Sequence, residues 1–246
     1  MSMVAGRVRY HFCHVDDAPD APLPVPMSDS SDKPLVVAIS SRALFDLDST
    51  HQIYEDQGLQ AYMDYQRERE DEVLQPGVAF PLVTKLLGLN DDDMDHPGVE
   101  VLLLSRNSAD TGLRIFNSIE HHDLRIERAV FTNGASPANY IEPVGADLFL
   151  SANAEDVRKV LMAGYAAATI LPQATRENRS GQLRIAFDGD AVIFSDEAER
   201  VYKTQGLEAF SSSEREAAMT PLRAGPFKAV LEAIHRIQSA LSLIHI

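Results

Sequence analysis

Leu35-Val-Val-Ala-Ile-Ser40 is a short apolar run between polar segments, and it opens the pattern that decides the fold. Runs of about four to eight apolar residues are typical of strands that are buried on both faces of a parallel sheet. Four further runs of this kind follow, at residues 100–105, 127–132, 147–151 and 166–171. We therefore expect five strands in the first two thirds of the chain.

Stretches with helical spacing separate these strands, at residues 52–66, 78–88, 109–119 and 154–162. Regular alternation of strands and helices predicts an α/β fold, in which helices cover both faces of a parallel sheet. The sequence thus predicts a Rossmann-like domain.

The composition limits the classes of partner. The 246 residues carry a formal net charge of −15, which argues against binding to nucleic acid or to an anionic membrane surface. Cys13 is the single cysteine, so no disulfide can form within the chain, which favours a reducing, cytoplasmic environment. The sequence shows neither a signal peptide nor an apolar run of the roughly 18 residues that a spanning helix needs.

Three regions follow from the changes in composition. Residues 1–33 are rich in proline and aspartate and are predicted to be a disordered tail, within which Met27 is an alternative start to Met1. Residues 34–175 form the first α/β domain. After a polar linker, residues 183–246 begin a second domain with a strand at 183–187 and a helix from Pro226 to about Ala240.

An internal repeat relates the two domains. A gapless alignment that places Ala38 on Ala186 also pairs Tyr-x-x-Gln-Gly-Leu-x-Ala at 54–61 with the same block at 202–209. About a dozen identities over about fifty positions favour a duplicated unit, although two amphipathic helices of similar composition remain an alternative. Because the first copy continues for four more strands and the second does not, we expect the second copy to be incomplete.

The sharpest motif is Arg184-Ile-Ala-Phe-Asp188-Gly-Asp190-Ala-Val192, an apolar strand that ends in D-x-D-x-V. A carboxylate at the end of such a strand can attack phosphorus, and a second one can protonate the leaving alkoxide and then activate water. Mg²⁺ would offset the repulsion between Asp188, Asp190 and a phosphate. An ordinary Asp-Gly-Asp turn is the alternative.

A second D-x-D-x-T match occurs at Asp46-Leu-Asp48-Ser-Thr50. In the register of the repeat, Asp188 and Asp190 fall on Ser40 and Arg42 instead. Asp46 also lies beyond the end of its apolar run, so we favour Asp188 and Asp190 as the reactive pair.

The D-x-D-x-V strand is typical of haloacid dehalogenase-like phosphatases, and the wider sequence resembles one family among them, the cytosolic type I 5'-nucleotidases. The resemblance covers roughly residues 35–240 and is carried by Ile39–Phe45, Asn117–Ile119, His122–Leu124, Asn133–Pro137, Leu150–Ala152 and Ala186–Ala191. It implies a cytoplasmic, Mg²⁺-dependent hydrolase of nucleoside 5'-monophosphates such as AMP. It also implies that Asp188 is the nucleophile, that Asp190 is the acid and base, and that both hold the metal.

The family also uses a Thr or Ser, a Lys and a pair of aspartates after later strands, and none of these follows residue 192 here. We therefore expect this chain to be truncated, with weak or absent turnover. Ser105, which follows the second strand of the first copy, is a candidate phosphate ligand. Tyr202, Gln205 and Phe210 are candidate contacts to the base or ribose, although they could equally belong to a core.

Two other functions stay open. With Ser40 and Arg42 in place of two aspartates, the first copy reads as a degenerate phosphatase-like domain, so the chain could be a non-catalytic module that binds nucleotide or forms homo-oligomers. A related phosphatase acting on sugar or lipid phosphates is the other alternative.

Overall fold

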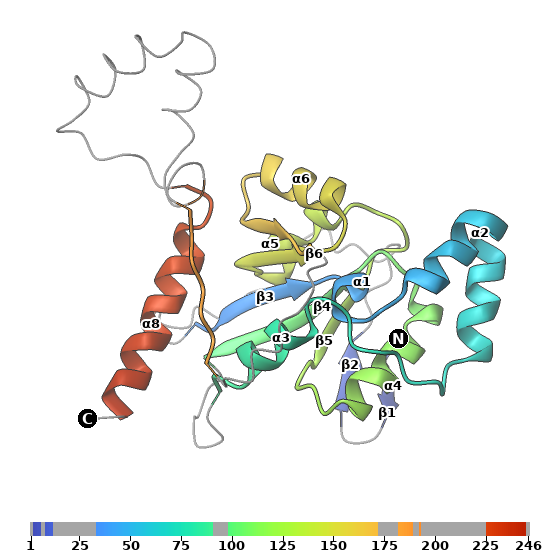
Figure 1. Cartoon of the computed structure of the whole chain (residues 1–246), viewed down its shortest axis with the longest axis horizontal. Helices are drawn as coiled ribbons and strands as arrows, with labels where there is room; N and C mark the ends of the chain where they lie inside the picture. Colours follow the sequence, from blue (N-terminus) through green and yellow to red (C-terminus); the bar gives the residue numbers. More distant parts are fainter. Residues whose placement is uncertain are drawn as a thin grey trace, which may run out of the picture.

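The computed structural model describes residues 2–5, 8–11, 33–90, 98–171, 182–188, 192 and 225–244. Its centre is a sheet formed by β3 (Leu35–Ile39), β4 (Val99–Ser105), β5 (Arg128–Phe131), β6 (Leu148–Ser151) and β7 (Ala167–Thr169) (Figure 1). All neighbouring strands are parallel, in the spatial order β5-β4-β3-β6-β7. The α/β fold, the parallel sheet and its five expected strands are confirmed.

The helices of this region are α1 (Ser41–Leu44), α2 (Asp48–Glu68), α3 (Phe80–Leu87), α4 (Leu113–His121), α5 (Ile141–Val144) and α6 (Ala154–Met162), with 3₁₀ turns η2 (Ala109–Thr111) and η3 (Pro137–Asn139). Four of them, α2, α3, α4 and α6, lie where the spacing of apolar residues predicted helices, and two short ones, α1 and α5, were not predicted. No helix in the described parts of the chain is long and apolar enough to cross a membrane.

Each face of the sheet has its own apolar core, because side chains alternate along a strand. Val37 and Ile39 of β3 join a core formed with α1, α3 and α4, whereas Val36 and Ala38 join a core formed with α5 and α6. All five residues of β3 are therefore buried. Figure 1 shows α5 and α6 on one side of the sheet and α3 and α4 on the other.

The order of the strands creates a switch point. The chain runs outward from β3 through β4 to β5 and then returns to β6 on the other side of β3. In open α/β sheets, ligands bind outside the carboxyl ends of the strands where the order reverses in this way. Here that place is the space beyond the carboxyl ends of β3 and β6.

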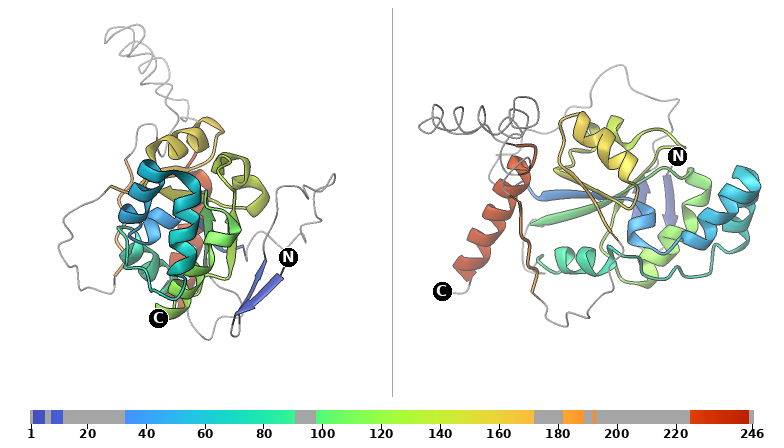
Figure 2. Two further views of the ribbon diagram at one scale, coloured as in Figure 1. Left: turned by 90° about the vertical axis from the view of Figure 1, so that its right-hand side faces the viewer. Right: turned by 45° about the horizontal axis from the view of Figure 1, so that its top comes forward.

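Helix α2 stands at this carboxyl edge and consists of two helical arms joined at Gly58, as the views in Figure 2 show. Gly58 has φ 84° and ψ −178°, a conformation that is essentially restricted to glycine. The kink separates the arm that carries Tyr54 from the arm that carries Tyr62.

Helix α8 (Lys228–Ile244) lies at the opposite, amino edge of the sheet (Figures 1 and 2). Its apolar side enters the same core as α3, with Val230 and Ala233 buried, as is Phe227 just before the helix. Arg236 Nη2 also donates a hydrogen bond to the Lys33 carbonyl oxygen at 3.3 Å. The expected helix near residues 226–240 is therefore present, and it packs on the first domain.

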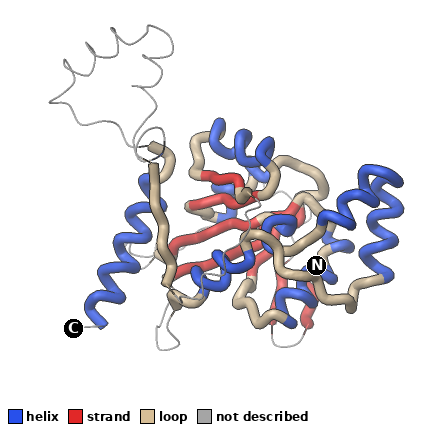
Figure 3. Tube along the Cα trace, in the orientation of Figure 1, coloured by secondary structure: helices blue, strands red, loops and turns tan. Residues whose placement is uncertain are grey.

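Residues 182–188 form no strand (Figure 3), which corrects the expected strand at 183–187. A strand needs a neighbouring strand to satisfy its backbone groups, and none lies beside this segment among the described residues. Leu183 and Phe187 instead pack against the core, while Ile185 is exposed. Most of the predicted second copy lies outside the described residues, so the duplication and the domain boundaries stay predictions.

The amino-terminal tail also differs in part from the expectation of disorder. The structure contains an antiparallel pair of strands, β1 (Ser2–Ala5) and β2 (Val8–His11). The sequence Gly6-Arg7 separates the two strands, and a separation of two residues is typical of a tight β-hairpin. The rest of residues 1–32, including Met27, lies outside the described residues.

Candidate functional site

A pocket of about 420 Å³ occupies the carboxyl edge of the sheet, at the switch point. Most of the residues that line it lie at or just after the carboxyl ends of β3, β4, β5 and β6, and Asp156 comes from α6: Ser40–Arg42, Arg106–Ser108, Asn133, Gly134, Ser151, Asn153 and Asp156. Because the carboxyl ends of parallel strands lie at the same edge of the sheet, the loops that follow these strands all contribute residues to a single cavity.

Ser40 and Arg42, which follow β3, bring a hydroxyl and a guanidinium to the pocket. Ser40 Oγ and Arg42 Nε are buried and have no hydrogen-bond partner among the described residues. Asn107, after β4, adds a third atom, Nδ2, that makes no hydrogen bond of good geometry with the described residues, although the Asn107 side chain is close enough to the Tyr62 hydroxyl to oppose the rise in the pKa of Tyr62. Arg42 Nη2 lies 3.5 Å from a carboxylate oxygen of Asp48, whose side chain is 89% exposed, so this ion pair is weak.

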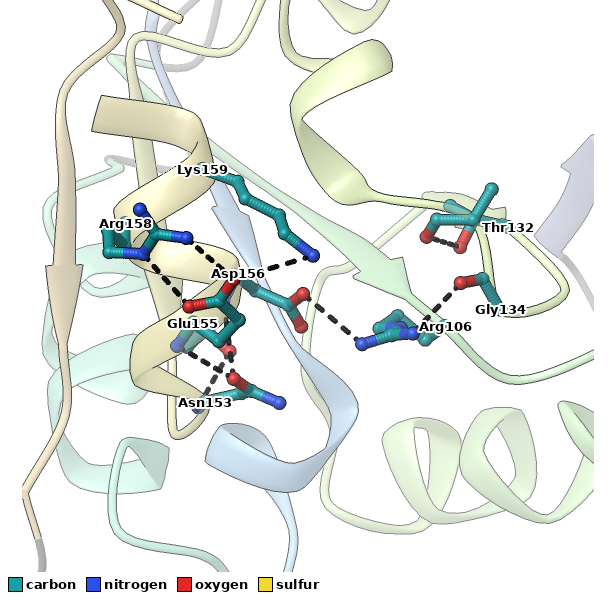
Figure 4. Close-up of polar contacts among 10 residues, drawn as sticks. Arg106, Thr132, Gly134, Asn153, Glu155, Asp156, Arg158 and Lys159 are labelled. Atoms are coloured by element: carbon teal, nitrogen blue, oxygen red, sulfur yellow. Dashed lines mark hydrogen bonds and ion pairs between the residues drawn. The ribbon is translucent and has the colours of Figure 1, made fainter. Parts of the chain in front are cut away.

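A brace formed by Arg106 connects three parts of the site (Figure 4). Its Nη1 lies 3.4 Å from Asp156 Oδ1, and its Nη2 donates to the Gly134 carbonyl oxygen at 3.0 Å. The loop after β4, the loop after β5 and the first turn of α6 are thereby held together. The side chain of Asp156 is only 5% exposed, so the nearby guanidinium is needed to compensate its charge.

The two acidic residues in the first turn of α6 differ in their surroundings (Figure 4). Burial raises the pKa of Asp156, although Arg106 and Lys159 partly oppose the shift. Glu155 is directed to Arg158, whose hydrogen bonds lower the pKa of Glu155 to about 2. Asn153 caps the helix by accepting from the backbone N–H groups of both acidic residues, so the turn that borders the pocket is well defined.

The other wall of the pocket is apolar and aromatic. Leu47, Tyr54, Leu59 and Tyr62 line it, and the last three belong to α2. Tyr54 and Tyr62 meet edge to face at 6.2 Å between ring centroids. Burial raises the pKa of the Tyr62 hydroxyl, which also receives a hydrogen bond from Gln66 Nε2 at 3.2 Å. The pocket therefore offers donors on one side and flat apolar surface on the other.

Asp188, the predicted nucleophile, does not line this pocket. Asp188 is exposed at the end of the 182–188 segment, which runs beside α8 (Figure 1), and Phe187 contacts Phe227 at 6.1 Å between ring centroids. Lys85 Nζ, at the end of α3, donates to the Gln182 carbonyl oxygen at 3.3 Å. The described part of this segment is thus fixed at the amino edge of the sheet, away from the pocket.

Four other candidate residues, Asp190, Tyr202, Gln205 and Phe210, lie outside the described residues, so their roles stay predictions. Ser105 does not line the pocket. It is buried, its Oγ lies 2.9 Å from Ser41 Oγ, and it accepts from the Asn107 backbone N–H at 3.2 Å. The Ser105 hydroxyl is therefore occupied by contacts within the protein and is not exposed to a phosphate in the pocket.

The competing aspartate, Asp46, does not line the pocket either. It is exposed, and its Oδ1 accepts from the Asp48 backbone N–H at 3.1 Å, a local turn that precedes α2. Within the described residues, no group of three or more His, Cys, Asp or Glu side chains is placed to hold a metal ion.

The pocket residues Arg42, Arg106, Asn107 and Asn153 were not among the candidate site residues from the sequence. The available signal was their position, since each of them comes one to three residues after a strand at the carboxyl edge. The partner of Arg106, Asp156, is 50 positions away in the chain, so the spacing of residues alone did not indicate their pairing.

The doubly wound sheet and the pocket at its switch point define an α/β protein of the ligand-binding Rossmann type. The family model for 5'-nucleotidase matches residues 27–244, and the chain belongs to that family. The chain is 37% identical over 212 residues to human cytosolic 5'-nucleotidase 1B. That match covers 83% of this chain and 34% of the relative, so the chain spans about a third of the relative's length. No solved structure shows significant similarity to it.

Proposed function

We propose that this chain is part of a cytoplasmic 5'-nucleotidase, which hydrolyses nucleoside 5'-monophosphates to nucleoside and phosphate. The observation that carries the proposal is the family match, which spans residues 27–244 and so includes the Asp188-Gly-Asp190 motif. The name of the human relative agrees with this activity.

In the proposed reaction, Asp188 attacks the phosphorus atom and forms an aspartyl-phosphate as the nucleoside leaves. Asp190 gives a proton to the departing 5'-oxygen and then takes one from the water that cleaves the aspartyl-phosphate. The exposure of Asp188 is compatible with this role, because the carboxylate must be reached by substrate.

The donor set of Asp188 and Asp190 suits Mg²⁺, which prefers hard oxygen ligands and typically takes one or two carboxylates, substrate phosphate and several waters. When bound, the ion would neutralise negative charge on the phosphate and the two carboxylates. The family pattern also uses a lysine after a third strand and a pair of aspartates after a fourth, whereas beyond residue 192 this chain carries lysines only at 203 and 228 and a single aspartate, Asp196. This chain alone is therefore proposed to turn over weakly.

The test compares phosphate release from AMP with Mg²⁺ by the 246-residue chain and by a clone extended downstream to the next stop codon. The extended protein should be active, the present chain should be much slower, and Asp188→Asn should lower the rate of the extended protein by at least about 10³-fold.

Asp46→Asn is the matched control, because it neutralises the exposed aspartate of the similar motif. It should leave the rate within about twofold. Activity that survives Asp188→Asn, or that disappears in Asp46→Asn alone, would reject the assignment. Faster hydrolysis of sugar phosphates than of AMP would instead favour the related phosphatase, and an inactive extended protein would favour the non-catalytic module.

A further inference from the structure

The pocket at the carboxyl edge contains buried polar atoms that the described residues leave without hydrogen-bond partners. Ser40 Oγ, Arg42 Nε and Asn107 Nδ2 are all buried, and none has a hydrogen-bond partner among the described residues. Buried polar groups in native proteins are nearly always paired, so three atoms in one cavity that lack a partner among the described residues point to a bound ligand. They come from the ends of two adjacent strands, β3 and β4, and thus face one region.

The charges in this region favour an anion. Two guanidinium groups, Arg42 and Arg106, line the pocket together with one carboxylate, Asp156. That carboxylate is already paired with Arg106. Among the described acidic residues, Arg42 has only a weak contact with Asp48, which leaves its positive charge available to a ligand. A hydroxyl, an amide and a guanidinium are also donors that fit the oxygens of a phosphate.

The opposite wall limits the ligand further. Tyr54 and Leu59 are among the few large apolar side chains that are strongly exposed in the described residues, and both line the pocket. Together with Tyr62 they present aromatic and apolar surface to the cavity. A ligand that fills it would therefore carry a phosphate at one end and a flat apolar group at the other.

We propose that this pocket binds a nucleotide through its phosphate, as a second site that is separate from the Asp188 motif. The fixed positive charge of Arg42 can compensate the charge of the phosphate directly, so binding needs no Mg²⁺. Ser40 and Arg42 supply neither a nucleophilic carboxylate nor a base, so the pocket holds its ligand without hydrolysing it. This inference goes beyond the proposed activity, because it concerns different residues at the opposite edge of the sheet.

The test is calorimetric titration of the 246-residue chain with AMP in excess EDTA, where turnover plays no part. AMP should bind, whereas adenosine and ribose 5-phosphate, which each lack one half of the proposed recognition, should bind at least about tenfold more weakly. Arg42→Gln should weaken AMP binding about tenfold or more, since it removes a charged donor. Asp48→Asn is its matched control, because it removes the exposed partner and keeps the guanidinium; binding should not weaken.

Ser40→Ala separates binding from folding. The Ser40 hydroxyl has no partner among the described residues, so its removal should leave the melting temperature of the free protein unchanged while weakening AMP binding severalfold. Asp188→Asn should bind AMP as the parent chain does, even if it has lost activity.

Three results would overturn the proposal: no binding of AMP at millimolar concentration, binding that requires Mg²⁺ or Asp188, or equal affinity in Arg42→Gln. Adenosine binding as tight as that of AMP would overturn the phosphate assignment in particular, and equally tight binding of ribose 5-phosphate would overturn the role of the aromatic wall.

Discussion

Replacing Arg106 by glutamine removes the cation that compensates Asp156 while keeping a polar side chain of similar length. The fold places Asp156 almost completely out of water, with its side chain 5% exposed, whereas that of Arg106 is 47% exposed. The substitution therefore leaves a buried carboxylate without its partner, and it also removes the hydrogen bond to the Gly134 carbonyl oxygen.

The expected loss of stability follows from these two contacts. Breaking a fully buried ion pair costs about 3–5 kcal/mol, and the half-exposed position of Arg106 reduces that figure because water can approach the pair. The lost hydrogen bond to Gly134 is worth about 1 kcal/mol. We expect a total of about 2–3 kcal/mol at neutral pH, or a melting temperature lower by roughly 4–12 °C.

The loss should depend on pH in a defined direction. Burial already raises the pKa of Asp156 above its usual value, and removal of Arg106 raises it further. A carboxyl whose pKa is higher in the folded than in the unfolded protein lowers stability as pH rises from the unfolded towards the folded pKa. Once the pH falls below the raised folded pKa of Asp156 in Arg106→Gln, the carboxyl is protonated and carries no charge, so the loss of stability should shrink to about that of the lost hydrogen bond.

Thermal and urea unfolding of the parent chain, Arg106→Gln, Asp156→Asn and the double variant give the complete cycle. In the Asp156→Asn background, Arg106→Gln should cost only about 1 kcal/mol, because no buried charge remains. An equal cost in both backgrounds, or a cost that does not change between about pH 4 and pH 7, would refute the reasoning.

Three further substitutions test the fold around the pocket. Gly58→Ala should lower stability by about 1–3 kcal/mol, since φ 84° strains any side chain, and circular dichroism melts against the matched Gln60→Ala would show the difference. Phe149→Ala, in the core under α6, should cost about 3–5 kcal/mol in urea unfolding, and Phe149→Leu much less. Asn153→Ala removes an acceptor of two backbone N–H groups and should cost about 1 kcal/mol, whereas Asn153→Ser should restore most of it; equal losses would contradict a capping role.

The strands of the first domain could be predicted because burial on both faces of a parallel sheet leaves a simple local pattern. All five residues of β3 are buried, and they form the apolar run from Leu35 to Ile39. The same pattern failed at residues 183–187, where the apolar residues look like a strand but no neighbouring strand lies beside them among the described residues. A strand depends on its partner, and one segment cannot reveal whether the partner is there.

The site was harder to predict for a geometric reason. Ser105 was chosen because it ends an apolar run, yet it still belongs to β4 and directs its hydroxyl to Ser41. Side chains reach the pocket only from the residues that follow, Arg106–Ser108, where the chain has left the sheet. The pairing of Arg106 with Asp156 joins residues 50 positions apart, so no local spacing could indicate it.

The docking of α8 determines where the chain can be shortened. Phe227, Val230 and Ala233 fill part of the core beneath β3, although the composition of the sequence placed a domain boundary near residue 175. Each fully buried side chain of the size of valine or phenylalanine contributes about 1.5–3 kcal/mol. A version cut at residue 175 would expose the apolar surface that α8 covers. It is expected to bind hydrophobic dyes and to precipitate. Adding residues 225–244 as a separate peptide should restore its solubility.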